Sequence, residues 1–274
     1  MTKEVSGEPL DLHPFRGRID RHYNHPLFRK AISDCRLLES PAAKVVLQSR
    51  NRIGVVPLPT TNGGRRNIFV KEYRQVGVDE LKSLFISSKA RRAWLGAVGL
   101  VERGIPTPLP VAYLERRKKG FVAGNCFLSE EVSDASEIRG LFRKLPEDEL
   151  RRLLAALAGF LSSCHRKGIL HRDLSDGNIL VRKENGGNWK FWLLDTNRIR
   201  IKRRIGLGKA VKNLVRLGIP PHLQDFFLKS YLNGKSPGRV LFLWYRINKA
   251  GFARSISFKK KLRLRKLARR LKIQ

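Results

Sequence analysis

The chain has 274 residues, of which 42% are hydrophobic, so it can bury a sizeable core as one large domain or as two lobes. Its 57 Lys and Arg residues against 23 Asp and Glu give a net charge of +34, which implies a polyanionic partner, either nucleic acid or an anionic membrane surface. No apolar run approaches the roughly 18 residues that span a bilayer, and we see no secretory signal, so we expect a cytosolic protein.

Three cysteines, Cys35, Cys126 and Cys164, are scattered along the chain. Their odd number and wide spacing argue against a disulfide framework and against a zinc cluster. The sequence therefore predicts three reduced thiols.

The first 40 residues are polar and lack a sustained hydrophobic period. We expect an N-terminal extension with one short helix near residues 27–38. From residue 43 onward, short runs rich in Val and Ile predict three consecutive antiparallel strands, with the second turn at Asn62–Gly64. These strands are expected at residues 43–48, 53–59 and 67–74.

Lys71 lies on the third predicted strand, where period-2 alternation places it on the same face as Phe69. Such a lysine is either an edge residue whose stem covers apolar surface or a buried cation that awaits phosphate oxygens. The motif at residues 171–180, described below, favours the second alternative. No glycine-rich loop joins the first two strands, so a phosphate cover there would have to be Ser49–Arg52.

Residues 79–103 have the apolar spacing of a helix, which Gly104, Pro106 and Pro108 would end. A further pair of strands is predicted at residues 108–115 and 120–132. The extended stretch at residues 128–132 then passes into a helix, and in a two-lobed protein this is where the lobes would be joined.

The strongest helix prediction covers residues 147–168, with acidic residues in the first turn, leucines at i, i+3, i+4 spacing and a terminal Gly168. The stretch HRDLSDGNIL at residues 171–180 follows it directly. This stretch places Asp173 and Asn178 five residues apart, an arrangement that phosphoryl transfer requires. The carboxylate would orient a hydroxyl, and the nearby amide oxygen would hold a metal.

Asp195 ends the next apolar run, WKFWLLD. It follows Asp173 by 22 residues, across a predicted hairpin, so the two carboxylates can lie side by side.

Residues 197–274 contain 23 Lys and Arg and one acid, Asp225. At the end of the chain, residues 257–274 place leucines on one face of a predicted helix and cations on the others. A basic amphipathic helix of this type suits a membrane surface. The alternative is a solvated helix that packs on the protein through its leucines.

Lys71, Asp173, Asn178 and Asp195, in these motifs, resemble the protein-kinase-like fold. More narrowly, FVKEYR, SKARRAW, RGIPTPLPVAYLE, LSEEV, HRDLSDGNILV and LLDTNRIR are similar to the lipopolysaccharide core kinases of the Kdo/WaaP family. The resemblance implies an α+β, two-lobed fold with an antiparallel-sheet N-lobe and a mainly helical C-lobe. The expected parts are an extension (1–40), an N-lobe (41–132), a C-lobe (133–256) and a basic amphipathic helix (257–274).

The resemblance also implies an ATP- and magnesium-dependent kinase that phosphorylates an inner-core sugar, Kdo or heptose, of lipopolysaccharide at the cytoplasmic face of the inner membrane. Asp173 would accept the proton of the sugar hydroxyl, Asn178 and Asp195 would bind magnesium, and Lys71 would hold the ATP phosphates. The expected partners are a lipopolysaccharide core or lipid A precursor and the anionic inner-membrane surface, without nucleic acid.

The chain departs from the protein-kinase pattern in several places. A protein kinase pairs this lysine with a glutamate on a helix, but the position expected for that glutamate is Ala93. Glu80 and Glu102 are the alternative candidates for the partner of Lys71. Ser175 stands where many protein kinases have a lysine, so an arginine from elsewhere would have to substitute. Thr196-Asn197 replaces Phe-Gly after Asp195.

No A-P-E-like segment follows Asp195, which favours a small-molecule or glycolipid acceptor over a peptide. Two other hypotheses compete. One is an atypical protein-kinase-like enzyme that acts on a protein or ribosome-associated substrate. The other is a non-enzymatic nucleic-acid-binding protein, against which the absence of a recognisable reader module counts.

Overall fold

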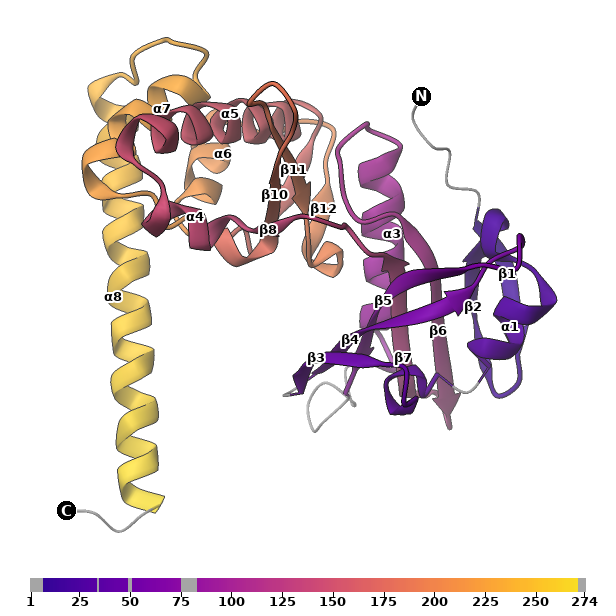
Figure 1. The fold of residues 1–274 in the computed structure, drawn as a ribbon. Helices are drawn as coiled ribbons and strands as arrows, with labels where there is room; N and C mark the ends of the chain where they lie inside the picture. The colour runs from indigo at the N-terminus through magenta and orange to yellow at the C-terminus, as the bar shows by residue number, and fades with distance from the viewer. Residues whose placement is uncertain (1–6, 34, 49–50, 75–82, 271–274) are drawn as a thin grey trace. The chain divides into compact units, whose positions relative to one another are not determined.

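A computed structural model describes residues 7–33, 35–48, 51–74 and 83–270 (Figure 1). The chain divides into two compact units. Unit 1 comprises residues 1–136 and 179–201, and unit 2 comprises residues 137–178 and 202–274. The mixture of an antiparallel sheet with several helices confirms the α+β class.

Unit 1 is built on an antiparallel sheet that, over the described residues, has seven strands in the order β1-β2-β6-β7-β5-β4-β3 (Figure 1). The five strands predicted between residues 43 and 132 are confirmed. Their bounds are β3 Lys44–Gln48, β4 Asn51–Pro59, β5 Arg65–Tyr73, β6 Pro110–Lys118 and β7 Phe121–Glu130.

The first 40 residues contribute two strands that their sequence did not predict, β1 Gly7–Leu12 and β2 Phe15–Asp20. Because β2 pairs with β6, this segment belongs to the sheet and is no mere extension. A Cβ at Gly17 would lie 1.8 Å from the Tyr113 carbonyl oxygen, so this close pairing requires glycine. The short helices η1 Arg21–Tyr23, α1 Pro26–Ala31 and η2 Leu37–Glu39 follow.

The two faces of the sheet bury different elements, as the alternation along β5 and β7 requires. Ile68, Val70 and Leu128 share one buried cluster with side chains of α1 and η2. Tyr73 and Phe127 share the other cluster with helix α3, Lys89–Val101. Lys71 alternates with the first set, so it lies on the face that α3 covers.

Helix α3 begins at Lys89, although the apolar spacing predicted a helix from residue 79. Ser88 caps it, because its hydroxyl accepts a hydrogen bond from the Arg91 N–H at 3.0 Å. Residues 83–86 form turns and a bend instead of helix, and residues 79–82 lie outside the described residues. The start of α3 is thus set by its serine cap and not by the apolar spacing of the preceding residues.

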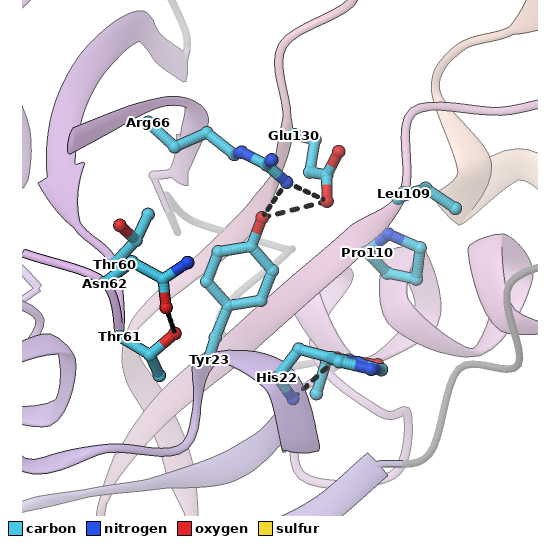
Figure 2. Close-up of a pocket in the computed structure, with 10 residues that line it drawn as sticks. His22, Tyr23, Thr60, Thr61, Asn62, Arg66, Leu109, Pro110 and Glu130 are labelled. Carbon is cyan, nitrogen blue, oxygen red and sulfur yellow. Dashed lines mark hydrogen bonds and ion pairs between the residues drawn. The ribbon is translucent and has the colours of Figure 1, made fainter. Parts of the chain in front are cut away.

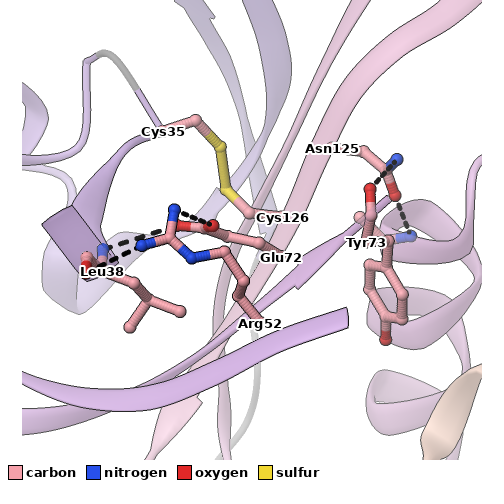
Figure 3. Close-up of a disulfide and its surroundings, with 8 residues drawn as sticks. Cys35, Leu38, Arg52, Glu72, Tyr73, Asn125 and Cys126 are labelled. Carbon is pink, nitrogen blue, oxygen red and sulfur yellow. Dashed lines mark hydrogen bonds and ion pairs between the residues drawn. A yellow bond between two sulfur atoms is a disulfide. The ribbon is translucent and has the colours of Figure 1, made fainter. Parts of the chain in front are cut away.

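A disulfide between Cys35 and Cys126 shows that the prediction of three reduced thiols was wrong (Figure 3). The two residues are 91 positions apart in sequence, with Cα atoms 6.6 Å apart. The packing of the segment after α1 on β7 brings the two cysteines together, so their spacing in the sequence could not indicate a disulfide. Cys164 is free and buried, and burial raises the pKa of its thiol to about 12.

The hairpin of β10 Ile179–Lys183 and β11 Trp189–Leu193 confirms the hairpin predicted before Asp195. It belongs to unit 1, together with η4 Thr196–Arg198 and β12 Ile199–Ile201. The two-residue strand β8, Ser136–Glu137, lies at the boundary of the units.

Unit 2 is mainly helical. The predicted helix at residues 147–168 is confirmed as α5 Glu147–Arg166, with its leucine stripe buried. The other elements are α4 Ile138–Lys144, β9 Ile169–His171, η3 Asp176–Asn178, α6 Leu207–Leu214, η5 Pro221–Leu223, α7 Gln224–Tyr231 and α8 Arg239–Arg270.

Helix α8 runs for 32 residues, so the helix predicted from residue 257 is the end of a longer element. No helix within the described ranges combines the length and apolar character needed to cross a membrane.

Replacing both Cys35 and Cys126 by serine should lower the free energy of unfolding by about 2–4 kcal/mol, because the disulfide restricts the unfolded chain. Urea unfolding without reductant measures this, with Cys164→Ser as the variant that leaves the disulfide intact. Thiol labelling of the unfolded, unreduced protein should modify Cys164 alone. Labelling of all three cysteines before reduction would contradict the assignment.

Candidate active site

Lys71 and Asp195 form an ion pair in unit 1, in which the Lys71 ammonium donates to Asp195 Oδ1. The Lys71 side chain is only 13% exposed, and its Nζ lies 5.6 Å from the centroid of the Tyr73 ring. Burial raises the pKa of Tyr73, and the Asp195 carboxylate adds to this effect, so the phenol stays neutral. Lys71 is therefore a buried cation and not an edge residue.

Within the described residues, Lys71 pairs with the carboxylate of Asp195, which lies in the turn after β11. Ala93 stands on α3 where the helix glutamate of a protein kinase was sought. Glu102, one of the alternatives, is exposed and lies 3.7 Å from Arg103. Glu80, the other alternative, lies outside the described residues.

Helix α3 instead holds the turn that carries Asp195. Thr196 Oγ1 donates a hydrogen bond of 2.8 Å to the Ala93 carbonyl. A Cβ at Gly96 would lie 2.1 Å from the Thr196 carbonyl oxygen, so the turn packs directly on the helix backbone. Asp195 adopts the left-handed conformation, with φ 50°, that this approach requires. The small residues of α3 thus fix the carboxylate opposite Lys71.

Asp173 and Asn178 lie together in unit 2, in the loop that follows β9. The Asn178 side-chain amide donates to the Asp173 carbonyl at 2.8 Å, and the Asp173 N–H donates to His171 Nδ1 at 3.1 Å. Since the amide nitrogen is engaged, the Asn178 Oδ1 oxygen is left as the group that can accept a cation.

A buried network that the sequence did not reveal supports this loop. Asn213 Nδ2 donates to the His171 carbonyl at 2.8 Å, and His165 Nε2 lies 3.1 Å from Asn213 Oδ1. His165 Nδ1 lies 2.7 Å from the Tyr231 hydroxyl. Because burial lowers the pKa of His165, its ring is neutral and orients Asn213 through hydrogen bonds alone. His165 was visible in the sequence only as one of the basic residues at a helix end.

Arg216 was also missed by the sequence interpretation. Its Nη2 lies 2.6 Å from Asp173 Oδ1, and Nη1 donates to the Arg172 carbonyl at 3.3 Å. No motif marked this arginine among the many basic residues after position 196.

The structure therefore brings the four predicted site residues together in two pairs, Lys71 with Asp195 and Asp173 with Asn178. The first pair belongs to unit 1 and the second to unit 2. A single site made from both pairs, with Asp195 beside Asp173, stays a prediction.

The proposed phosphate cover at Ser49–Arg52 is described only in part. Arg52 lies 3.4 Å from Glu72 and 3.1 Å from Glu39, and it donates to the Leu38 carbonyl beside the disulfide (Figure 3). The Arg52 side chain therefore joins η2 to the sheet and is engaged by groups of the protein itself. Ser49 and Arg50 lie outside the described residues.

A separate hollow of about 240 Å³ in unit 1 contains none of the four predicted residues (Figure 2). At its edge Tyr23 donates to Glu130 at 2.9 Å, and Arg66 donates to both side chains. Burial raises the pKa of Tyr23 to about 12, so it remains a neutral donor. This network ties the segment after β2 to β5 and β7.

Comparison with known proteins supports a kinase relationship. The profile of the lipopolysaccharide kinase (Kdo/WaaP) family matches residues 79–220, which is more than half of the chain. The solved structure of WaaP in complex with acyl carrier protein superposes with a TM-score of 0.55 and 22% identity, over 86% of this chain and 96% of that one. This structural likeness confirms the kinase-like fold.

Two protein kinases are also similar over shorter segments. The carbon catabolite-derepressing protein kinase of Candida tropicalis is 30% identical over 139 residues, which are 48% of this chain and 22% of the yeast protein. Sperm motility kinase 2B of Mus musculus is 38% identical over 68 residues, or 25% of this chain and 11% of the mouse protein. The matched regions thus span a small part of these relatives.

Replacing Gly96 by alanine should lower the free energy of unfolding by about 1–3 kcal/mol, because the new methyl group overlaps the Thr196 carbonyl. Gly159→Ala is the matched control, since a Cβ there meets no atom within 4 Å on the exposed side of α5. It should stabilise the protein by about 0.5–1 kcal/mol. Urea unfolding of both variants checks the pair, and equal effects would show that α3 does not hold the Asp195 turn.

Proposed function

The chain belongs to the lipopolysaccharide kinase (Kdo/WaaP) family, and we propose that it transfers a phosphoryl group from ATP to a hydroxyl of an inner-core sugar, Kdo or heptose, of lipopolysaccharide. The observation that carries this proposal is the intact set of Lys71, Asp173, Asn178 and Asp195 within a chain of this family. Membership of a kinase family makes the protein a phosphotransferase, and the nature of the acceptor is our proposal.

Lys71 is suited to hold the phosphates of ATP. It is a largely buried cation that, among the described residues, pairs with the Asp195 carboxylate, and a metal ion could replace the ammonium beside that carboxylate. Phosphate oxygens would then take the place of Asp195 beside Lys71. The ion pair therefore keeps both groups in position before the substrates bind.

The oxygen ligands that magnesium prefers are present in the two pairs. Asn178 directs its amide nitrogen to the Asp173 carbonyl, which leaves Oδ1 for the metal, and Asp195 offers a partly exposed carboxylate. These two residues would hold the ion. Bound there, magnesium would neutralise charge on the phosphate oxygens.

Asp173 is suited to act as the base. Its carboxylate is partly exposed, and its backbone is fixed by Asn178 and His171. The sugar oxygen forms a bond to the γ-phosphorus while the bond from that phosphorus to the bridging oxygen breaks, and the electron pair leaves with ADP. Asp173 accepts the proton of the sugar hydroxyl.

The segment after Asp195 favours a sugar over a peptide as the acceptor. The chain passes through η4 and β12 and enters α6 at Leu207. This short path contains no A-P-E-like sequence, so it lacks the peptide platform of a protein kinase. The similarity to the Candida and mouse protein kinases supports the second candidate, a protein or ribosome-associated acceptor.

Helix α8 supports a position at the cytoplasmic face of the inner membrane. Its first turns expose Val240, Leu243, Trp244 and Ile247, which lie at i, i+3, i+4, i+7 spacing on one face. Nine Lys and Arg residues follow between residues 257 and 274. An exposed apolar stripe with flanking cations suits the surface of an anionic bilayer.

Asp173→Ala should lower kcat by about 10²–10⁴-fold, because proton transfer to a positioned base contributes that much. Asp195→Asn should lower it comparably, since the amide still accepts a hydrogen bond from Lys71 but binds magnesium poorly. Phosphate transfer from ATP to a Kdo- or heptose-bearing lipid A acceptor measures both.

Asp148→Asn, at an exposed position in the first turn of α5, is the control and should leave transfer unchanged. Transfer that survives Asp173→Ala would remove Asp173 as the base. Transfer to protein with none to any core glycolipid would favour the second candidate function.

Deleting residues 257–274 should weaken binding to anionic vesicles while leaving turnover of a soluble sugar acceptor largely intact. Each Lys or Arg near an anionic surface contributes about 1 kcal/mol, so the loss of four or five engaged cations lowers the vesicle partition constant by about 10³-fold. Sedimentation with anionic vesicles checks this, and neutral vesicles are the control. Unchanged binding would show that the tail packs on the protein.

A further inference from the structure

Arg216 lies against Asp173 in unit 2, in the turn directly after α6. Its Nη2 is 2.6 Å from the Asp173 carboxylate, and its Nη1 donates to the carbonyl of Arg172 at 3.3 Å. One guanidinium therefore contacts both the side chain of Asp173 and the backbone immediately before it. The planar guanidinium thus bridges the Asp173 carboxylate and the Arg172 carbonyl, which ties the orientation of that carboxylate to the backbone of the loop.

Helix α8 holds this arginine from the other side. The guanidinium carbon lies 5.1 Å from the centroid of the Phe252 ring, which is a stacking contact. One turn earlier, Lys249 Nζ donates to the carbonyl of Leu217 at 2.8 Å, which fixes the residue that follows Arg216. The Arg216 Nε atom is buried and has no hydrogen-bond partner among the residues that the structure describes. The Arg216 side chain, which is 37% exposed, is thus stacked on Phe252 and directs its two terminal nitrogens to the loop.

The loop itself supplies no lysine next to Asp173. Its sequence is HRDLSDGN, with Ser175 two positions after the base, and Arg172 offers only its carbonyl oxygen to Arg216. A cation beside the base orients the carboxylate and offsets negative charge as the phosphoryl group moves. In unit 2 the guanidinium of Arg216 occupies the place beside Asp173 where such a cation acts.

We propose that Arg216 is the positioning residue for Asp173, and that it replaces from outside the loop the lysine that Ser175 lacks. The inference rests on the proposed function, since it gives a residue for the same transfer. Arg216 forms and breaks no covalent bond: the acceptor oxygen bonds to the γ-phosphorus, the electron pair of the broken bond leaves with ADP, and Asp173 takes the proton. Arg216 keeps the carboxylate turned toward that hydroxyl.

A second-site rescue tests the proposal. Arg216→Ala should lower kcat by about 10²–10³-fold, the usual cost of removing one group that stabilises the reacting centre, with the KM for ATP changed less than threefold. Adding Ser175→Lys to this variant should raise kcat at least tenfold above that of Arg216→Ala alone, because it returns a cation to the loop. Ser175→Lys alone should bring no gain, since Arg216 already fills the role.

Two further variants separate positioning from folding. Phe252→Leu removes the stacked ring but keeps the arginine, and it should lower kcat by about threefold to tenfold without changing urea unfolding. Arg246→Ala is the matched control on α8, because Arg246 is exposed and stacks on Phe242 at 5.7 Å, outside the described contacts of Asp173. It should retain the wild-type rate.

Each variant is measured twice, as phosphate on the Kdo- or heptose-bearing lipid and as ADP released without acceptor, where water takes the phosphoryl group. If the wild-type protein leaves the glycolipid unmodified, the proposed function fails, and ADP release still ranks the Arg216 variants. A wild-type rate for Arg216→Ala would overturn the positioning role. A loss that Ser175→Lys does not restore would overturn it as well, because a merely structural arginine would give that result.

Discussion

The ion pair between Lys71 and Asp195 joins two segments that are 124 residues apart in the chain, and it links the turn after β11 to the sheet of unit 1. The interior strand β5 contributes the ammonium, and the turn after β11 contributes the carboxylate. The Lys71 ammonium is largely removed from water and the Asp195 carboxylate partly so, and each stabilises the other against the cost of burying a lone charge. The hairpin of β10 and β11 is thereby held to the sheet through a polar contact as well as through packing.

Helix α3 has small side chains where the turn that carries Asp195 packs on it. One of them stands at the position where a protein kinase would carry a glutamate. Ala93 offers a backbone carbonyl to Thr196, and Gly96 lets the turn approach the helix backbone. In the described part of the chain, a hydrogen bond and a close packing contact join α3 to this turn, and Lys71 pairs with the Asp195 carboxylate. In unit 2, Asp173 likewise pairs with a cation from outside its own loop, Arg216.

Local signals in the sequence were sufficient to predict the elements that have a regular hydrophobic pattern of their own. Val- and Ile-rich runs predicted β3 to β5, and the leucine stripe with acidic first turn predicted α5. The motif residues predicted the pairing of Asp173 with Asn178 in one loop. The strands β1 and β2 could not be predicted in this way, because GEPLDL and FRGRID are polar and become strands by pairing with each other and, through β2, with β6. The disulfide, Asn213 and Arg216 act through contacts between distant segments, for which neither spacing nor composition leaves a trace.

The most direct test of the account is the ³¹P NMR spectrum of a Kdo- or heptose-bearing lipid A acceptor after incubation with the wild-type protein, ATP and magnesium. We expect a new phosphomonoester resonance that couples to a proton of the sugar ring, since the transferred phosphorus would be bonded to a ring hydroxyl oxygen. Consumption of ATP that yields only inorganic phosphate or phosphoprotein, with the spectrum of the glycolipid unchanged, would contradict the assignment of a sugar hydroxyl as the acceptor.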